Sequence, residues 1–159
     1  MRRNCDTKNV PYILLLLCIA MTLFIFSNSI RNSAESNETS GFFLDLLRPV
    51  TEALDKIFGT ADWNFIIRKG AHFTEFCILG MLVTSLKLSL QAKTNGYCLF
   101  YVLSVAVTDE LVQSFSDRTS SVRDVLLDFS GAAFGIALIL LIYRLRIRRR
   151  KGKKNEHKN

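Results

Sequence analysis

The sequence predicts an all-α integral membrane protein with four transmembrane helices. Apolar residues make up 49% of its 159 residues, and they gather in four long runs. A helix needs about 20 mostly apolar residues to cross a bilayer, and four windows meet that length: 10–30, 65–86, 96–115 and 122–143. Little sequence remains for a soluble domain, so residues 1–159 are expected to form a single membrane domain.

The first span, residues 10–30, follows a short basic segment with Arg2, Arg3 and Lys8. A basic segment before an apolar run is also typical of a cleaved signal peptide. The candidate cleavage region, Ser27-Asn28-Ser29, has small residues but no clear Ala-x-Ala pattern. A retained first span is therefore the main prediction, and cleavage is the alternative.

The distribution of charge predicts the topology. The formal net charge is +7, and residues 144–159 hold nine basic residues and one acid. The loop between the second and third spans carries Lys87 and Lys93, whereas the long first loop, about residues 31–64, is acidic on balance. Because basic segments stay in the cytoplasm, both termini are predicted to be cytoplasmic and loop 31–64 external. The basic tail is expected to attract anionic lipid, and no nucleic acid partner is predicted.

Within the external loop, residues 42–58 show helical periodicity. Their apolar residues fall on one face of a helix and their charged residues on the other, with Pro49 as an interruption. We expect an amphipathic segment that lies on the outer membrane surface. A loop packed over the mouth of the bundle is the alternative, and either arrangement would cover the outer ends of the spans.

The cysteines do not indicate a disulfide or a zinc site. None of the four lies in the external loop, where disulfides would form, and no Cys/His spacing is typical of zinc binding. They are expected to behave mainly as small apolar side chains. No metal and no cofactor are predicted. The four residues are Cys5, Cys18, Cys77 and Cys98.

Eleven polar residues interrupt the last three spans and the turn between the third and fourth. A charge at the centre of a membrane helix costs about 2.5–3.5 kcal/mol, so these residues are expected to face one another or a functional site. Because the spans alternate in direction, each polar group lies at the outer end of its span, and all should meet at one depth. The residues of this candidate polar site are Arg68, Lys69, His72, Glu75, Asp109, Glu110, Gln113, Arg118, Arg123, Asp124 and Asp128.

The last span combines acids with small residues. Asp124 and Asp128 share one helical stripe with Gly131 and Gly135, so carboxylates stand at the outer end and glycines lie deeper. Two glycines four residues apart let a second helix approach closely. Gly131 and Gly135 are therefore predicted to be helix-packing positions.

Two non-enzymatic interpretations of the candidate polar site remain open. The charges could form ion pairs that only hold the helices together. Alternatively, Arg68, Arg118 and Arg123 could bind a phosphate or carboxylate group, because guanidinium forks match those anions. An anionic lipid or a cell-wall precursor at the outer face would then be the partner.

Two further interpretations involve chemistry or transport. An enzyme could use His72 as an acid or base while the carboxylates hold a divalent cation, although no nucleophile is evident. Proton-coupled transport is disfavoured, because the inner halves of the spans carry no ionisable residue to complete a path. No catalytic residue is assigned. The carboxylates concerned are Glu75, Asp109, Glu110, Asp124 and Asp128.

The order of these residues resembles that of VanZ-like membrane proteins. Residues 68–76 read RKGAHFTEF and are followed by Leu79-Gly80. Residues 109–115 read DELVQSF, and after them come Arg118, Arg123-Asp124-Val125, Asp128 and the pair Gly131 and Gly135. The resemblance covers about residues 65–140, and many family members carry Asn where this chain has Asp128.

This resemblance implies a bacterial envelope protein. The family's named member is associated with resistance to the glycopeptide teicoplanin, and no enzymatic mechanism is established for the family. We therefore expect a multi-pass protein of the bacterial cell membrane that affects glycopeptide susceptibility by binding or modifying a cell-surface component. A membrane enzyme acting on a phosphate-bearing, lipid-linked cell-wall precursor and a non-catalytic membrane scaffold are the alternatives.

Overall fold

The computed structural model describes residues 9–30, 62–94, 96–115 and 121–156, and the short stretches 45–46, 48–49 and 51–52. Its long elements are helices, and no strand occurs among these residues. The helices are α1 (Val10–Ile30), α3 (Trp63–Ser89), α4 (Gly96–Ser114) and α5 (Val122–Glu156). Most of the predicted amphipathic segment 42–58 lies outside the described residues, as do Cys5 and Arg118. The predicted all-helical class is confirmed.

Three of these helices are long and apolar enough to cross a membrane. They are α1, α3 and the part of α5 from Val122 to Arg149. Helix α4, with 19 residues, is not among them, because Asp109, Glu110 and Gln113 in its last two turns make it less apolar. From the sequence, this segment was predicted to be a fourth span.

The helix boundaries follow local chemistry. Helix α1 has the predicted bounds, and α3 begins at Trp63 because the side chain of Asp62 accepts a hydrogen bond from the backbone N–H of Phe65 at 3.1 Å. This is an ordinary N-cap. Helix α5 continues beyond the expected end at Tyr143 to Glu156. The added segment has no proline, and its many Arg and Lys residues favour helix.

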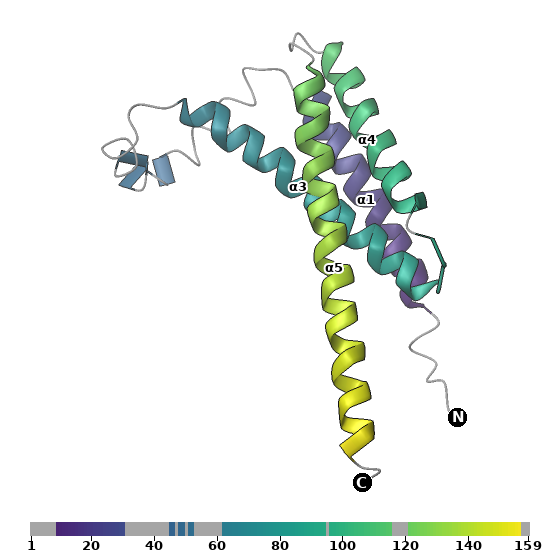
Figure 1. The fold of residues 1–159 in the computed structure, drawn as a ribbon. Helices are drawn as coiled ribbons and strands as arrows, with labels where there is room; N and C mark the ends of the chain where they lie inside the picture. Colours follow the sequence, from purple (N-terminus) through teal and green to yellow (C-terminus); the bar gives the residue numbers. More distant parts are fainter. Residues whose placement is uncertain are drawn as a thin grey trace.

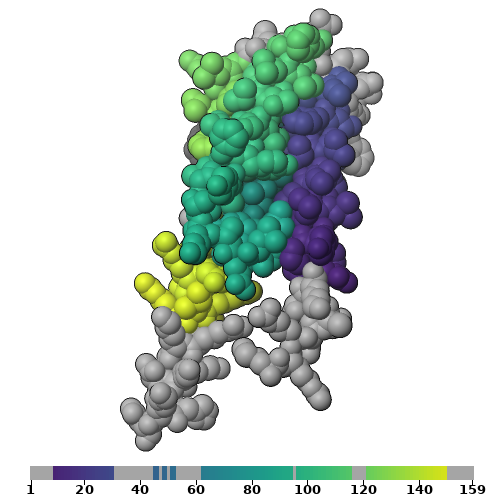
Figure 2. Space-filling model, turned by 90° about the vertical axis from the view of Figure 1, so that its right-hand side faces the viewer, coloured from purple at the N-terminus to yellow at the C-terminus, as the bar shows by residue number. Residues whose placement is uncertain are grey.

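The helices alternate in direction along the bundle (Figure 1). The C-terminal ends of α1 and α4 gather with the N-terminal end of α5, whereas α1 begins and α5 ends toward the opposite end of the molecule. Helix α3 crosses α5 obliquely and makes its most extensive contact with it. Helices α1 and α4 lie side by side (Figure 2), and a 2.9 Å hydrogen bond joins Thr22 to Tyr101.

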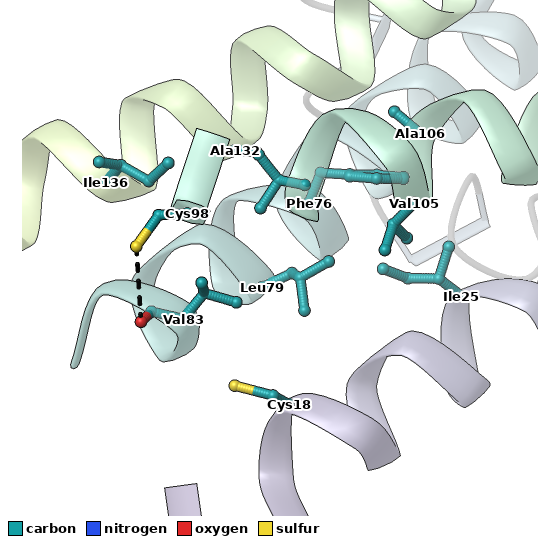
Figure 3. Packing of buried hydrophobic residues seen from close by; sticks show 11 residues of the cluster. Cys18, Ile25, Phe76, Leu79, Val83, Cys98, Val105, Ala106, Ala132 and Ile136 are labelled. Atoms are coloured by element: carbon teal, nitrogen blue, oxygen red, sulfur yellow. Dashed lines mark hydrogen bonds between the residues drawn. The ribbon is translucent and has the colours of Figure 1, made fainter. Parts of the chain in front are cut away.

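The buried apolar core takes side chains from all four helices. Figure 3 shows these side chains turned toward one another between the helices. Cys18 and Cys98 belong to this core, and the described cysteines are free thiols, as the sequence predicts. The core residues are Cys18, Ile25, Phe76, Leu79, Val83, Cys98, Val102, Val105, Ala106, Ala132 and Ile136.

Glycines bring the backbones of α3 and α5 into direct contact. A methyl group at Gly131 would overlap the carbonyl oxygen of Phe73, and one at Gly135 would overlap that of Cys77. From the opposite side, a methyl at Gly80 would overlap the carbonyl of Ala132. This is the close approach expected from the spacing of Gly131 and Gly135.

The outer surfaces of the helices are apolar. Even α4 exposes Phe100, Leu103, Val107 and Leu111, which lie on one face at helical spacing. Large contiguous apolar surface is unusual on a water-soluble monomer. This face of α4 is therefore suited to contact with lipid or with another apolar partner.

Candidate functional site

Polar side chains from all four helices meet near the end of the bundle where α4 ends and α5 begins. We call this group the polar cluster. Several members are almost fully buried, including Ser29, Asp109 and Asp128 at 0, 0 and 2% exposure. The polar cluster consists of Asn28, Ser29, Lys69, His72, Glu75, Asp109, Glu110, Gln113, Ser121, Asp124 and Asp128.

Asp109 connects α4 to α1. The hydroxyl of Ser29 donates to its Oδ1 at 2.5 Å, and the amide of Gln113 donates to its Oδ2 at 2.6 Å. The Gln113 amide also lies 3.3 Å from the Ser29 hydroxyl oxygen. Asp109 and Gln113 are one helical turn apart, so the i, i+4 spacing noted in the sequence places both on the face toward α1.

Glu75 connects α3 to α1. The amide nitrogen of Asn28 donates to Glu75 Oε1 at 2.8 Å. The other carboxylate oxygen, Oε2, lies 3.8 Å from Nδ1 of His72, three residues earlier on the same helix. Glu75 therefore joins α3 to α1 and stands beside the imidazole ring.

Lys69 connects α3 to α5. Its ammonium nitrogen lies 2.5 Å from Oδ2 of Asp124 and 5.4 Å from the centre of the Phe65 ring. The side chains of Lys69 and Asp124 keep 21% and 20% of their surface exposed. This ion pair therefore marks the more open side of the polar cluster.

Glu110 supports the start of α5. Its Oε1 accepts a hydrogen bond from the backbone N–H of Ser121. Ser121 in turn caps α5, because its hydroxyl accepts from the backbone N–H of Arg123 at 3.2 Å and its carbonyl accepts from that of Asp124 at 2.8 Å. The second oxygen of Glu110 is buried and has no hydrogen-bond partner among the described residues.

Asp128 lies one turn deeper on α5. It is 2% exposed, and no hydrogen bond or ion pair joins it to another described residue. One of its oxygens, one oxygen of Asp109 and one ring nitrogen of His72 all lie within 4.8 Å of one another. Three helices thus direct potential ligand atoms to one point.

The polar cluster holds more negative than positive groups. Lys69 faces Asp124 directly, whereas Glu75, Asp109 and Glu110 receive hydrogen bonds from neutral donors. Neutral donors stabilise a carboxylate but leave its charge in place. The interior of the polar cluster is therefore better suited to a cation than to an anion.

The arginines of the candidate polar site are not members of the polar cluster. Arg123 is exposed, and Arg68 is half-buried and forms no ion pair with a described residue. Arg118 lies outside the described part of the chain. The remaining eight residues of the candidate polar site are brought together, namely Lys69, His72, Glu75, Asp109, Glu110, Gln113, Asp124 and Asp128.

Asn28 and Ser29 were not identified from the sequence. The sequence indicated them only as part of a possible cleavage region. A signal for them was nevertheless present in the sequence, since they are polar, adjacent and located at the C-terminal end of an apolar span. Ser29 is completely buried against Asp109, so α1 is an integral part of the polar cluster.

Comparison with known proteins assigns the family. Residues 12–143 match the family model described as VanZ/LLP1. The matched range covers all of the polar cluster and most of the four helices. No curated protein and no solved structure matches the chain. Because the family model spans most of the sequence, this chain belongs to the VanZ/LLP1 family.

Proposed function

We propose that this VanZ-family chain is a four-span protein of the bacterial cell membrane that binds or modifies an outer-surface component and thereby changes susceptibility to teicoplanin-type glycopeptides. The observation that carries the proposal is the convergence of polar side chains from four helices at one end of an otherwise apolar bundle. Such residues are costly in a membrane and by default mark a functional site.

The proposal places α4 in the membrane as the fourth span. Its exposed face carries Phe100, Leu103, Val107 and Leu111, which suit lipid contact. Four spans return the chain to its starting side, in keeping with α1 beginning and α5 ending toward the same end (Figure 1). The basic end of α5 then lies in the cytoplasm, and the polar cluster faces outward.

The polar cluster contains features that a purely structural role does not require. Helix contacts in membranes need only small residues and hydrogen bonds between neighbours. Here Asp128 is buried and has no hydrogen-bond partner among the described residues. One carboxylate oxygen of Glu110 is also buried and has no hydrogen-bond partner among these residues. Lys69 and Asp124 remain partly exposed beside them. These features support binding of a ligand over scaffolding alone.

A second function is favoured by one specific observation. The convergence of His72, Asp109 and Asp128 resembles the ligand set of a metal-dependent enzyme. Such an enzyme would act on a phosphate-bearing, lipid-linked cell-wall precursor presented at the outer face. Purified protein incubated with lipid-linked precursors, with and without divalent metal, separates the two functions, because metal-dependent turnover identifies the enzyme.

The main test is genetic. Deletion of the gene should alter the teicoplanin susceptibility of the host, and the wild-type gene should restore it. Glu110→Gln keeps the size of the side chain and an acceptor for the Ser121 N–H, so the protein should accumulate normally in membranes but fail to restore susceptibility. Unchanged susceptibility after both deletion and overexpression would contradict the glycopeptide proposal. Full complementation by Glu110→Gln would exclude Glu110 from the site.

A further inference from the structure

We propose that His72, Asp109 and Asp128 bind a divalent first-row transition metal, for which Zn²⁺ is the best match. The three residues come from α3, α4 and α5, and their ligand atoms lie within 4.8 Å of one another. From the sequence, no metal was predicted, and His72 was interpreted only as a possible acid or base. This inference concerns the chemistry of the polar cluster and does not depend on the glycopeptide effect.

The spacing of the three ligand atoms is close to that of a metal site. Even if all three pairs were at the 4.8 Å limit, a central ion would lie about 2.8 Å from each atom. Zinc bonds to nitrogen and carboxylate oxygen measure about 2.0–2.2 Å. A shift of about 0.7 Å in each side chain therefore completes the site, which side-chain rotation alone can supply.

Asp128 gives independent support for a cation. It is 2% exposed, it forms no hydrogen bond or ion pair with another described residue, and its carboxylate points to the meeting place of the three side chains. Burying a charged carboxylate without a partner is costly. The nearest amine of the polar cluster, Lys69, is already paired with Asp124 at 2.5 Å. A bound cation would supply the missing partner.

Of the other two ligands, Asp109 is held by hydrogen bonds, and His72 has a carboxylate beside its ring. Asp109 receives hydrogen bonds from Ser29 and Gln113. His72 has Glu75 beside its ring, at 3.8 Å from Nδ1, and Glu75 is itself held by Asn28. Carboxylates beside a ligating histidine, and hydrogen bonds to a ligating carboxylate, are the usual orienting contacts around protein-bound metals.

The donor types select the class of metal. One imidazole nitrogen and two carboxylate oxygens suit Zn²⁺ and its neighbours in the first transition row, whereas Mg²⁺ and Ca²⁺ prefer oxygen ligands alone. Three protein ligands leave at least one position for water or for an oxygen of a phosphate or carboxylate ligand. The site would therefore add an anion-binding position to a cluster whose own charge is mainly negative.

The test uses the full-length protein purified in detergent and freed of metal with a chelator. It is titrated with ZnCl₂, and bound zinc is measured after removal of free metal. We expect a single zinc ion per chain, and at least about a tenfold loss of affinity in Asp128→Asn and His72→Gln, since even loss of an orienting contact costs about 10- to 100-fold. The matched control is Asp62→Asn, at the exposed N-cap of α3 outside the polar cluster, which keeps a capping side chain and should bind zinc as the wild type does.

The outcomes are decisive in either direction. Equal zinc affinity in wild type and Asp128→Asn, or an equal loss in Asp62→Asn, would overturn the proposal, because zinc would then be held elsewhere. If Asp128→Asn does not accumulate, the absorption spectrum of Co²⁺ bound to the wild-type protein distinguishes the proposed site from binding to cysteines. Weak visible bands without thiolate charge-transfer bands support the His/Asp site. Thiolate bands, which would indicate binding to cysteines, or the absence of bound Co²⁺ would overturn it.

Discussion

The hydroxyl of Ser29 donates a 2.5 Å hydrogen bond to the carboxylate of Asp109, although 80 residues separate them in the sequence. Both side chains are completely buried. The contact joins the last turn of α1 to α4 in the middle of the polar cluster. Through this contact, α1 forms part of the polar cluster.

Replacement of Ser29 should destabilise the protein. Ser29→Ala removes a donor to a buried carboxylate, which should lower the free energy of unfolding by about 1–2 kcal/mol. Denaturant titration of the detergent-solubilised protein, followed by circular dichroism, measures this change. Ser27→Ala is the matched control, because Ser27 is exposed on the same helix turn. Equal stability of Ser29→Ala and Ser27→Ala would show that the contact contributes little.

The first helix should remain attached to the mature protein. Cleavage near Ser29 would remove Ile25, which is fully buried in the core, and would disrupt the Asn28 and Ser29 contacts. A chain tagged at both ends should therefore give a single membrane-bound band that carries both tags. A major product that retains only the C-terminal tag would contradict this prediction and would support the signal-peptide alternative.

Adding volume at the α3–α5 contact should reduce accumulation. Gly131→Ala places a methyl group against the carbonyl oxygen of Phe73, and overpacking of this kind costs about 1–3 kcal/mol. Gly70→Ala is the matched control on α3, because a methyl group there meets no atom within 4 Å. It should be neutral or slightly stabilising, since Ala favours helix over Gly. Quantification of each variant in the membrane fraction checks the pair, and similar levels would argue against the tight contact.

The proposed topology makes a separate prediction. Reporter fusions at Lys93 and after Glu156 should report the cytoplasm, and a fusion between residues 31 and 61 should report the outside, because basic segments are retained inside. Alkaline phosphatase and green fluorescent protein give opposite signals on the two sides and serve as mutual controls. An active alkaline phosphatase after Glu156 would overturn the four-span arrangement and the outward orientation of the polar cluster.

Much of the fold was predictable because it depends on local properties of the chain. Apolar runs of the right length define the helices, and α1 has the predicted bounds. Short connections force neighbouring helices to alternate in direction, which brings the polar groups of α3, α4 and α5 to one end. The extension of α5 was missed because a basic segment without proline continues a helix without being apolar.

The partners within the polar cluster were decided only by the tertiary structure. Sequence spacing defines which residues share a helical stripe, but the rotation of each helix and its crossing angle determine which stripe meets which neighbour. Direct backbone contact at Gly80 and Gly131 sets the position of α3 against α5. That packing turns Asp128 inward while Arg123 stays exposed. The sequence by itself therefore determined the helices and the end of the bundle at which their polar residues lie, whereas helix packing decided that Ser29 meets Asp109 and that His72 and Asp128 converge on Asp109.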